Sequence, residues 1–299
     1  MEKDNTEEIG KQIASLALIE VGLGSLLHSF KIPLTGHFLS INQTALLSRS
    51  SFKLKSTKAP LEISLVASIL KSLSPAGKKL TPMLAIAAQG LLFYLGLFLG
   101  GINAFGLFIA VFLSSAWAFL QPVLFIYLLF GKTSLDVAEH FLQEIEKIFP
   151  HTDQIFVWII LALFFLKCII AYSLSWGFIR MSDDTFLKFQ NRMILEIKFK
   201  KPKTTSAFKL ALRDLFNPLF LFSFSFTFLF FILSQASFAQ ILWGLLRPLA
   251  IGLILFYCIR VYPIDKLSRF FKKKGLHRIS RLLTHASKAV NEKNKSKPL

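Results

Sequence analysis

Cysteine is nearly absent from this chain, and its scarcity excludes two kinds of site. Only Cys168 and Cys258 occur among the 299 residues, and each lies inside an apolar run. We therefore predict neither a disulfide framework nor a cysteine metal site, and we expect no cofactor. The phosphate-binding loop G-x-x-x-x-G-K-[ST] is also missing, so the sequence predicts no ATPase and offers no catalytic residues.

A cleavable secretory signal is missing as well. The N-terminal sequence MEKDNTEEIGKQ carries acidic residues where a signal peptide carries positive ones. No small-residue cleavage site follows the first apolar run. We expect that run to be retained as a helix.

Apolar residues are present in great excess. They make up 54% of the chain, which includes 33 phenylalanines, and the mean hydropathy is +0.56. A soluble domain of this length could not bury so much apolar surface, so we predict an all-α integral membrane protein. The runs that suit a spanning helix cover residues 13–30, 82–100, 104–130, 155–177, 216–234 and 240–260.

The distribution of Lys and Arg predicts how these spans are oriented. Residues 178–215 and the tail after Arg260 are rich in Lys and Arg, whereas the connector 131–154 is acidic. Because positive residues collect on the cytoplasmic side, we expect the loop, the tail and the N-terminus inside and the connector outside. The predicted segments are a cytoplasmic N-terminus (1–12), a six-helix membrane core (13–177), a basic cytoplasmic loop (178–215), a transmembrane hairpin (216–260) and a basic amphipathic cytoplasmic tail (261–299).

Two shorter apolar runs, residues 37–48 and 61–74, decide the number of spans. If both cross the membrane, the basic loop 48–60 falls inside, and a helical bundle of about eight spans has both termini in the cytoplasm. Residues 71–80, which hold three lysines, would then lie outside. An interfacial or re-entrant position for 61–74 therefore remains open.

Polar side chains gather in the segment GLGSLLHSFKIPLTGHFLSINQT, residues 22–44. Pro33 and Gly36 interrupt the helix there, and irregular backbone at membrane depth is tolerated where it faces protein or a wet cavity. We predict an outer vestibule that binds a small-molecule substrate; an ordinary surface loop is the alternative. The candidate residues are His28, Lys31, Thr35, His37, Asn42 and Gln43, together with Gln89, Trp117 and Gln121 in the outer halves of later helices.

The layout of residues 13–177 resembles a known family of transport proteins. A polar outer turn after the first helix, a short second helix and the run LKSLSPAGKKLTPMLAIAAQGLLFYLGLFLGGINAFG at 70–106 are similar to the substrate-binding S component of energy-coupling-factor (ECF) vitamin transporters. This resemblance implies that the chain captures a micronutrient, a vitamin or its precursor, from the outer side. It also implies a transmembrane coupling protein and ATPase subunits as partners.

Glu20 and Lys167 are ionisable residues inside predicted spans, where a charge is costly and usually faces the interior of the bundle. Their depths in the first and sixth helices of the core are similar enough for an ion pair. We predict this pair either as a structural contact between the two helices or as part of a relay or ligand site.

Two other functions remain open. Asp183 and Asp184, in RMSDDTFLKF, could be metal carboxylates of a membrane enzyme that acts on a lipid. The spaced aspartate motifs expected of lipid-phosphate chemistry are missing, however. A helical scaffold without a ligand is the third interpretation.

The basic tail has the pattern of an amphipathic helix. In residues 262–290, apolar residues recur at helical spacing beside Lys and Arg, which predicts an interfacial helix on the anionic inner leaflet of the bilayer. The tail contains no recognised nucleic-acid module, so we expect no nucleic-acid partner. The predicted location is the plasma (inner) membrane of a prokaryote.

Overall fold

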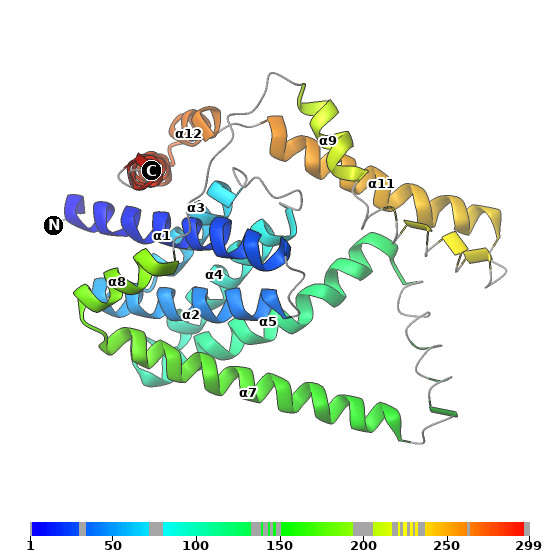
Figure 1. Cartoon of the computed structure of the whole chain (residues 1–299), viewed down its shortest axis with the longest axis horizontal. Coiled ribbons are helices and arrows are strands. Elements are labelled where there is room, and N and C mark those ends of the chain that lie inside the picture. The colour runs from blue at the N-terminus through cyan, green and yellow to red at the C-terminus, as the bar shows by residue number, and fades with distance from the viewer. Residues whose placement is uncertain are drawn as a thin grey trace. The chain divides into compact units, whose positions relative to one another are not determined.

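The computed structural model contains only helices as regular elements in the residues that it describes (Figure 1). These residues are 2–29, 34–71, 80–132, 151–193, 206–216, 237–261 and 264–295, with scattered positions between 139 and 147 and between 221 and 232. The all-α class predicted from the sequence is therefore confirmed. The helices are α1 (Glu2–Ser29), α2 (Thr35–Leu54), α3 (Ala59–Lys71), α4 (Leu80–Gly100), α5 (Ala104–Phe130), α7 (Thr152–Arg180), α8 (Asp183–Met193), α9 (Ala207–Leu215), α11 (Phe238–Val261), α12 (Ile264–Lys273) and α13 (His277–Lys295).

The chain forms two compact units. Unit 1 comprises Met1–Phe119, Phe164–Lys201 and Pro263–Leu299, and unit 2 comprises Leu120–Leu163 and Pro202–Tyr262. The basic tail therefore belongs to the same unit as the first helices of the chain. The long helices α5 and α7 each contribute residues to both units.

Three of the described helices are long and apolar enough to cross a membrane. The qualifying stretches are Thr81–Gly100, Ala104–Tyr127 and Gln154–Arg180, and they agree with three of the predicted spans. Only 17% of the most apolar window of α7 is buried within the protein. Many Ile, Leu and Phe side chains of α7 are exposed. Contiguous apolar surface of this kind is rare in soluble monomers.

Of the other predicted spans, 13–30 lies in α1 up to Ser29 and 240–260 lies within α11. The shorter runs and the span 216–234 differ from the structure or fall partly outside it. Helix α2 extends to Leu54 and is longer than the predicted run 37–48, whereas α3 has only 13 residues. At 1.5 Å per residue α3 is about 20 Å long, which is less than the thickness of a bilayer's hydrocarbon core. The span 216–234 and the connector 131–154 lie largely outside the described residues, so the eight-span bundle stays a prediction.

Small residues allow α4 and α5 to pack with their backbones in contact. A Cβ added to Gly96 would lie 2.3 Å from the Cα of Ala110, and one added to Gly100 would lie 2.4 Å from the Cα of Gly106. Gly101 turns the chain between the two helices with a φ of +77°, a conformation that glycine adopts without strain. The spacing Gly96-x-x-x-Gly100 therefore serves close helix packing, as the sequence suggests.

The core of unit 1 is built around α1 and includes the basic tail. Ile13 of α1 belongs to one buried apolar cluster with Leu282 and Leu283 of α13. At Gly10 the two helices are so close that an added Cβ would lie 3.2 Å from the Cβ of His285. The apolar face of α13 is thus packed against protein, which replaces the lipid contact predicted for that face.

Candidate functional site

Helix α2 is polar, yet much of it is buried. Hydroxyl groups within it donate to the carbonyl oxygen one turn back, as from Thr44 to Ser40 (2.9 Å) and from Ser48 to Thr44 (2.7 Å). Ser50 and Ser51 do the same toward Leu46 and Leu47. Because these groups are satisfied within the helix, burying them costs little free energy.

Two buried glutamines connect α2 to its neighbours. Gln43 Nε2 donates to Ser64 Oγ of α3 at 3.1 Å and to the carbonyl oxygen of Ile86 of α4 at 2.9 Å. Gln89 Nε2, from α4, donates to the carbonyl oxygen of Ser40 at 2.6 Å and to Thr44 Oγ1 at 2.9 Å. Both glutamines were predicted to line an outer vestibule, whereas the structure buries them between α2, α3 and α4.

A buried lysine joins this network from α7. The ammonium group of Lys167 donates to Ser40 Oγ at 3.1 Å and lies 5.8 Å from the centre of the Phe119 ring. The imidazole of His37 meets the same ring edge-on, with 4.8 Å between the ring centres. We call the following residues the buried polar cluster: Ser40, Gln43, Thr44, Ser64, Gln89 and Lys167.

Lys167 is a buried cation without a carboxylate partner. Its exposed fraction is 6%, and no Asp or Glu of the described chain lies within ion-pair distance of its ammonium group. Of its three N–H groups, one donates to the Ser40 hydroxyl. The other two have no hydrogen-bond acceptor in the described structure. A buried charge in this state costs stability, and an anion bound beside it would remove that cost.

Asn42 and Trp117 lie on other sides of their helices. Asn42 follows Ser40 by two residues on α2, and Trp117 precedes Phe119 by two on α5, which turns each nearly to the opposite face. Asn42 Nδ2 and Trp117 Nε1 are buried without a hydrogen-bond partner in the described structure. The structure therefore divides the predicted site, and only His37, Gln43 and Gln89 lie on or beside the buried polar cluster.

Four predicted site residues remain, and these are Thr35, Gln121, Lys31 and His28. Thr35 is buried at the first position of α2, and Gln121 belongs to the part of α5 in unit 2. Lys31 lies outside the described residues, and of His28 only the backbone position in α1 is described. The outer vestibule therefore stays a prediction.

Glu20 has a different partner from the one predicted. Its carboxylate Oε2 lies 3.8 Å from the ammonium nitrogen of Lys71, and that ammonium also donates to the carbonyl oxygen of Glu20. Both side chains are at most 4% exposed. Helix α3 packs against α1 and so brings Lys71 to Glu20. Lys167 bonds to Ser40 of α2 instead.

A second charged cluster, which we call the basic junction, joins three helices in unit 1. Arg49 of α2 is buried and donates to the carbonyl oxygens of Phe178 (2.6 Å) and Met181 (2.5 Å) and to Asp183 Oδ1 (2.5 Å). Lys53 lies 3.0 Å from the same carboxylate oxygen and 3.5 Å from Glu8 Oε1 of α1. The basic junction is therefore formed by Glu8, Arg49, Lys53 and Asp183.

The comparisons with known proteins add no identification. No family model, curated protein or solved structure matches the chain.

The basic junction borders a hollow of about 470 Å³ that includes Asp183. Hydrogen bonds from Lys53 and Arg49 hold the pKa of the Asp183 carboxyl below its usual range. Because Arg49 and Lys53 both bind Oδ1, protein groups already neutralise this carboxylate. A metal site would also need at least three ligating side chains, and no group of three His, Cys, Asp or Glu residues occurs among the described residues. The geometry does not favour the metal role considered for Asp183 and Asp184.

We expect Asp183→Asn to lower the melting temperature at pH 7 and to have a progressively smaller effect as the pH falls below about 4. A depressed carboxyl pKa stabilises the fold above the unfolded value of about 4, and this contribution is lost as pH falls through the folded value. Asp183 is exposed, so the effect is about 1 kcal/mol or less. Melting curves of both proteins across this pH range measure it. Asp184→Asn is the control, and an equal pH dependence in both variants would contradict the assignment.

Proposed function

We propose that this chain is a multi-pass membrane protein that captures a small micronutrient from the outer side, as the substrate-binding subunit of a transporter. Three apolar helices of spanning length, with mostly lipid-suited outer surfaces, support the membrane location. The resemblance of residues 13–177 to an ECF S component supports the transporter class. A separate coupling protein and ATPases would supply the energy.

The proposed topology has about eight spans and both termini in the cytoplasm of a prokaryotic cell. In unit 1, the beginning of α1, the end of α2 and the segment after α7 meet at the basic junction. The tail reaches the beginning of α3, where Arg278 Nε lies 2.8 Å from Glu62 Oε1. These are the segments that the positive-inside rule assigns to the cytoplasm, so their meeting at one end supports the proposal.

Lys167 is the single observation on which the ligand site rests. It is buried, cationic and without a carboxylate in the described structure, and it lies beside an aromatic ring and an imidazole. A cation with spare donors near aromatic rings suits a flat small molecule that carries a carboxylate. We therefore propose a carboxylate-bearing vitamin or precursor as the ligand class, bound by Lys167 and His37.

The two other functions have less support. A lipid-directed enzyme would need a free carboxylate pair, whereas Asp183 is engaged by Arg49 and Lys53. A ligand-free scaffold would have no use for the isolated charge of Lys167, which costs stability in a core. Neutralising Lys167 therefore distinguishes the two functions, because only a binding site would lose its ligand.

We expect Lys167→Met to keep or raise the melting temperature of the purified protein and to abolish ligand binding. Methionine fills a similar volume without a buried charge, so its packing cost is small. Binding is measured as the rise in melting temperature with a panel of carboxylate-bearing vitamins and precursors, each compared with its neutral amide. His37→Ala should weaken the same binding about tenfold, which corresponds to roughly 1.4 kcal/mol.

Lys188→Met, at an exposed lysine of α8, is the matched control and should bind as the unmodified protein does. The proposal is wrong if no carboxylate of the panel shifts the melting temperature. It is also wrong if Lys167→Met melts well below the unmodified protein, because the lysine would then be a structural contact.

A further inference from the structure

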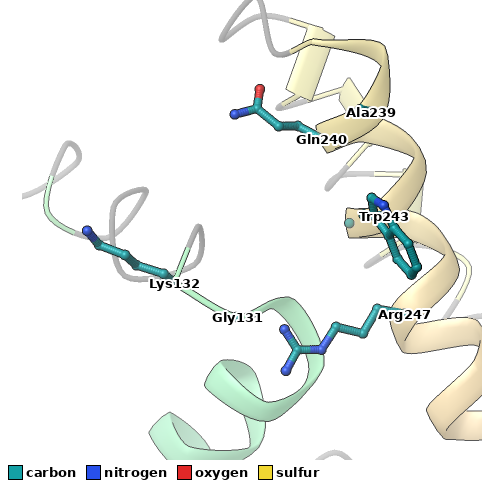
Figure 2. A pocket seen from close by; sticks show the side chains of 7 residues that line it. Gly131, Lys132, Ala239, Gln240, Trp243 and Arg247 are labelled. Carbon is teal, nitrogen blue, oxygen red and sulfur yellow. The ribbon is translucent and has the colours of Figure 1, made fainter.

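A pocket of about 430 Å³ lies within unit 2, between the end of α5 and one side of α11 (Figure 2). We call it the unit 2 pocket. It is lined by Gly131, Lys132, Ala239, Gln240, Trp243, Gly244 and Arg247. Two of these residues are cationic and none is acidic, so the lining carries a net positive charge.

The side chain of Arg247 is exposed on α11, and under the proposed membrane location a charge at this position is costly. It interrupts the apolar helix α11, and no Asp or Glu in the described part of the chain forms an ion pair with it. In Figure 2 its guanidinium group extends from α11 to the end of α5. A Cβ added to Gly131 would lie 2.7 Å from its Nη1, so the glycine makes room for it. An unpaired arginine in an apolar helix indicates a functional site.

The polar groups that remain available in this pocket are hydrogen-bond donors. The carbonyl oxygen Oε1 of Gln240 accepts from the backbone N–H of Ser237 at 2.9 Å and from its hydroxyl at 3.1 Å. The NH2 group of Gln240 is thereby left for another acceptor, and the Trp243 indole and the Lys132 ammonium can only donate. A site that offers donors and positive charge is complementary to an anion rich in acceptor oxygens, such as a phosphate.

The surroundings of the unit 2 pocket on α11 are apolar and exposed. Phe238, Leu242 and Leu246 flank Trp243 on the same helix, and all four side chains are exposed. An indole beside such residues is typical of the boundary between head groups and acyl chains. A phosphate bound to Arg247 would therefore have apolar surface next to it for the chains of a lipid.

We propose that the unit 2 pocket binds the phosphate group of an anionic lipid, with Arg247 and Lys132 as cations and Gln240 and Trp243 as neutral donors. The hollow at the basic junction offers no such site, because Asp183 and Glu8 already neutralise its cations. The inference depends on the proposed membrane location but not on the ligand of Lys167.

The test uses the full chain, purified in detergent and freed of lipid. Short-chain phosphatidylglycerol is titrated in parallel with phosphatidylcholine of the same chains and with inorganic phosphate, and bound lipid is counted by native mass spectrometry. We expect phosphatidylglycerol to bind more tightly than phosphatidylcholine and to raise the melting temperature. Arg247→Gln should weaken this binding at least tenfold, and Lys132→Gln and Gln240→Leu should weaken it several-fold.

Arg213→Gln, at an exposed arginine on α9 of the same unit, is the matched control and should bind like the unmodified protein. If the pocket variants also retain full binding, the pocket is not the lipid site and the proposal fails. If inorganic phosphate alone protects as strongly as phosphatidylglycerol, a soluble phosphate is the ligand and the lipid assignment is wrong. Should Arg247→Gln fail to fold, the other two variants decide the outcome.

Discussion

Glu20→Gln or Lys71→Met alone is expected to lower the free energy of unfolding by about 3 to 5 kcal/mol. Each change leaves one charge buried without a partner, since both side chains are at most 4% exposed and their charged atoms are 3.8 Å apart. The double variant should recover much of the loss, because two neutral side chains leave no charge to solvate.

Equilibrium unfolding of the four proteins in one detergent measures the coupling between the two sites. The exposed pair Glu7 and Lys11, with 2.9 Å between its charged atoms, is the matched control. Glu7→Gln and Lys11→Met should each change the free energy of unfolding by less than about 1 kcal/mol. If the losses at Glu20 and Lys71 simply add, the two side chains do not act as a pair.

Gly96→Ala is expected to destabilise the protein by about 1 to 3 kcal/mol, although alanine favours helices. The added Cβ would lie 2.3 Å from the Cα of Ala110 and 2.4 Å from its backbone nitrogen. These atoms belong to the backbone of α5, so no side-chain rotation relieves the clash. The two helices would have to move apart and lose contact along their whole interface.

Gly177→Ala on α7 is the control for helix propensity. Apart from the neighbouring backbone of α7 itself, no described atom lies within 4 Å of the position that its Cβ would take, so this change should be neutral or slightly stabilising. Thermal melts of both variants provide the comparison. Equal melting temperatures for Gly96→Ala and the unmodified protein would show that α4 and α5 are not packed as described.

Long apolar runs predicted part of this fold well. The run 104–130 coincides with α5, and 82–100 and 155–177 lie within α4 and α7. These helices are apolar around most of their circumference, so composition alone identifies them. Helix α2 continued past the predicted end at residue 48, because Arg49 and the neighbouring serines find hydrogen-bond partners that hydropathy does not record.

The partners of buried charges could not be predicted in the same way. If both short runs cross the membrane, Lys71 falls in an outer loop, at the start of the polar stretch 71–80. In the structure it ends α3 and contacts Glu20. Hydropathy shows that a charge lies in an apolar run but not which helices pack side by side. Ser40 had no signal at all, because a single serine becomes notable only when Lys167 is placed beside it.

The tail illustrates a related ambiguity. An amphipathic helix with a basic face suits an anionic membrane and a protein surface equally well by pattern. The buried side chains of Leu282, Leu283 and Ala286 show that protein covers the apolar face of α13. The contact of its basic face with anionic lipid stays a prediction.

The contact between α1 and α13 constrains how the protein is made. Helix α1 leaves the ribosome long before α13, which follows every other described helix in the chain. At about 5 to 20 residues per second, translation of the intervening residues takes tens of seconds. Throughout this time the face of α1 around Ile9 and Ile13 lacks its final partner. A nascent chain stalled before residue 277 would thus leave the apolar side chains of Ile9 and Ile13 without the partners that α13 provides.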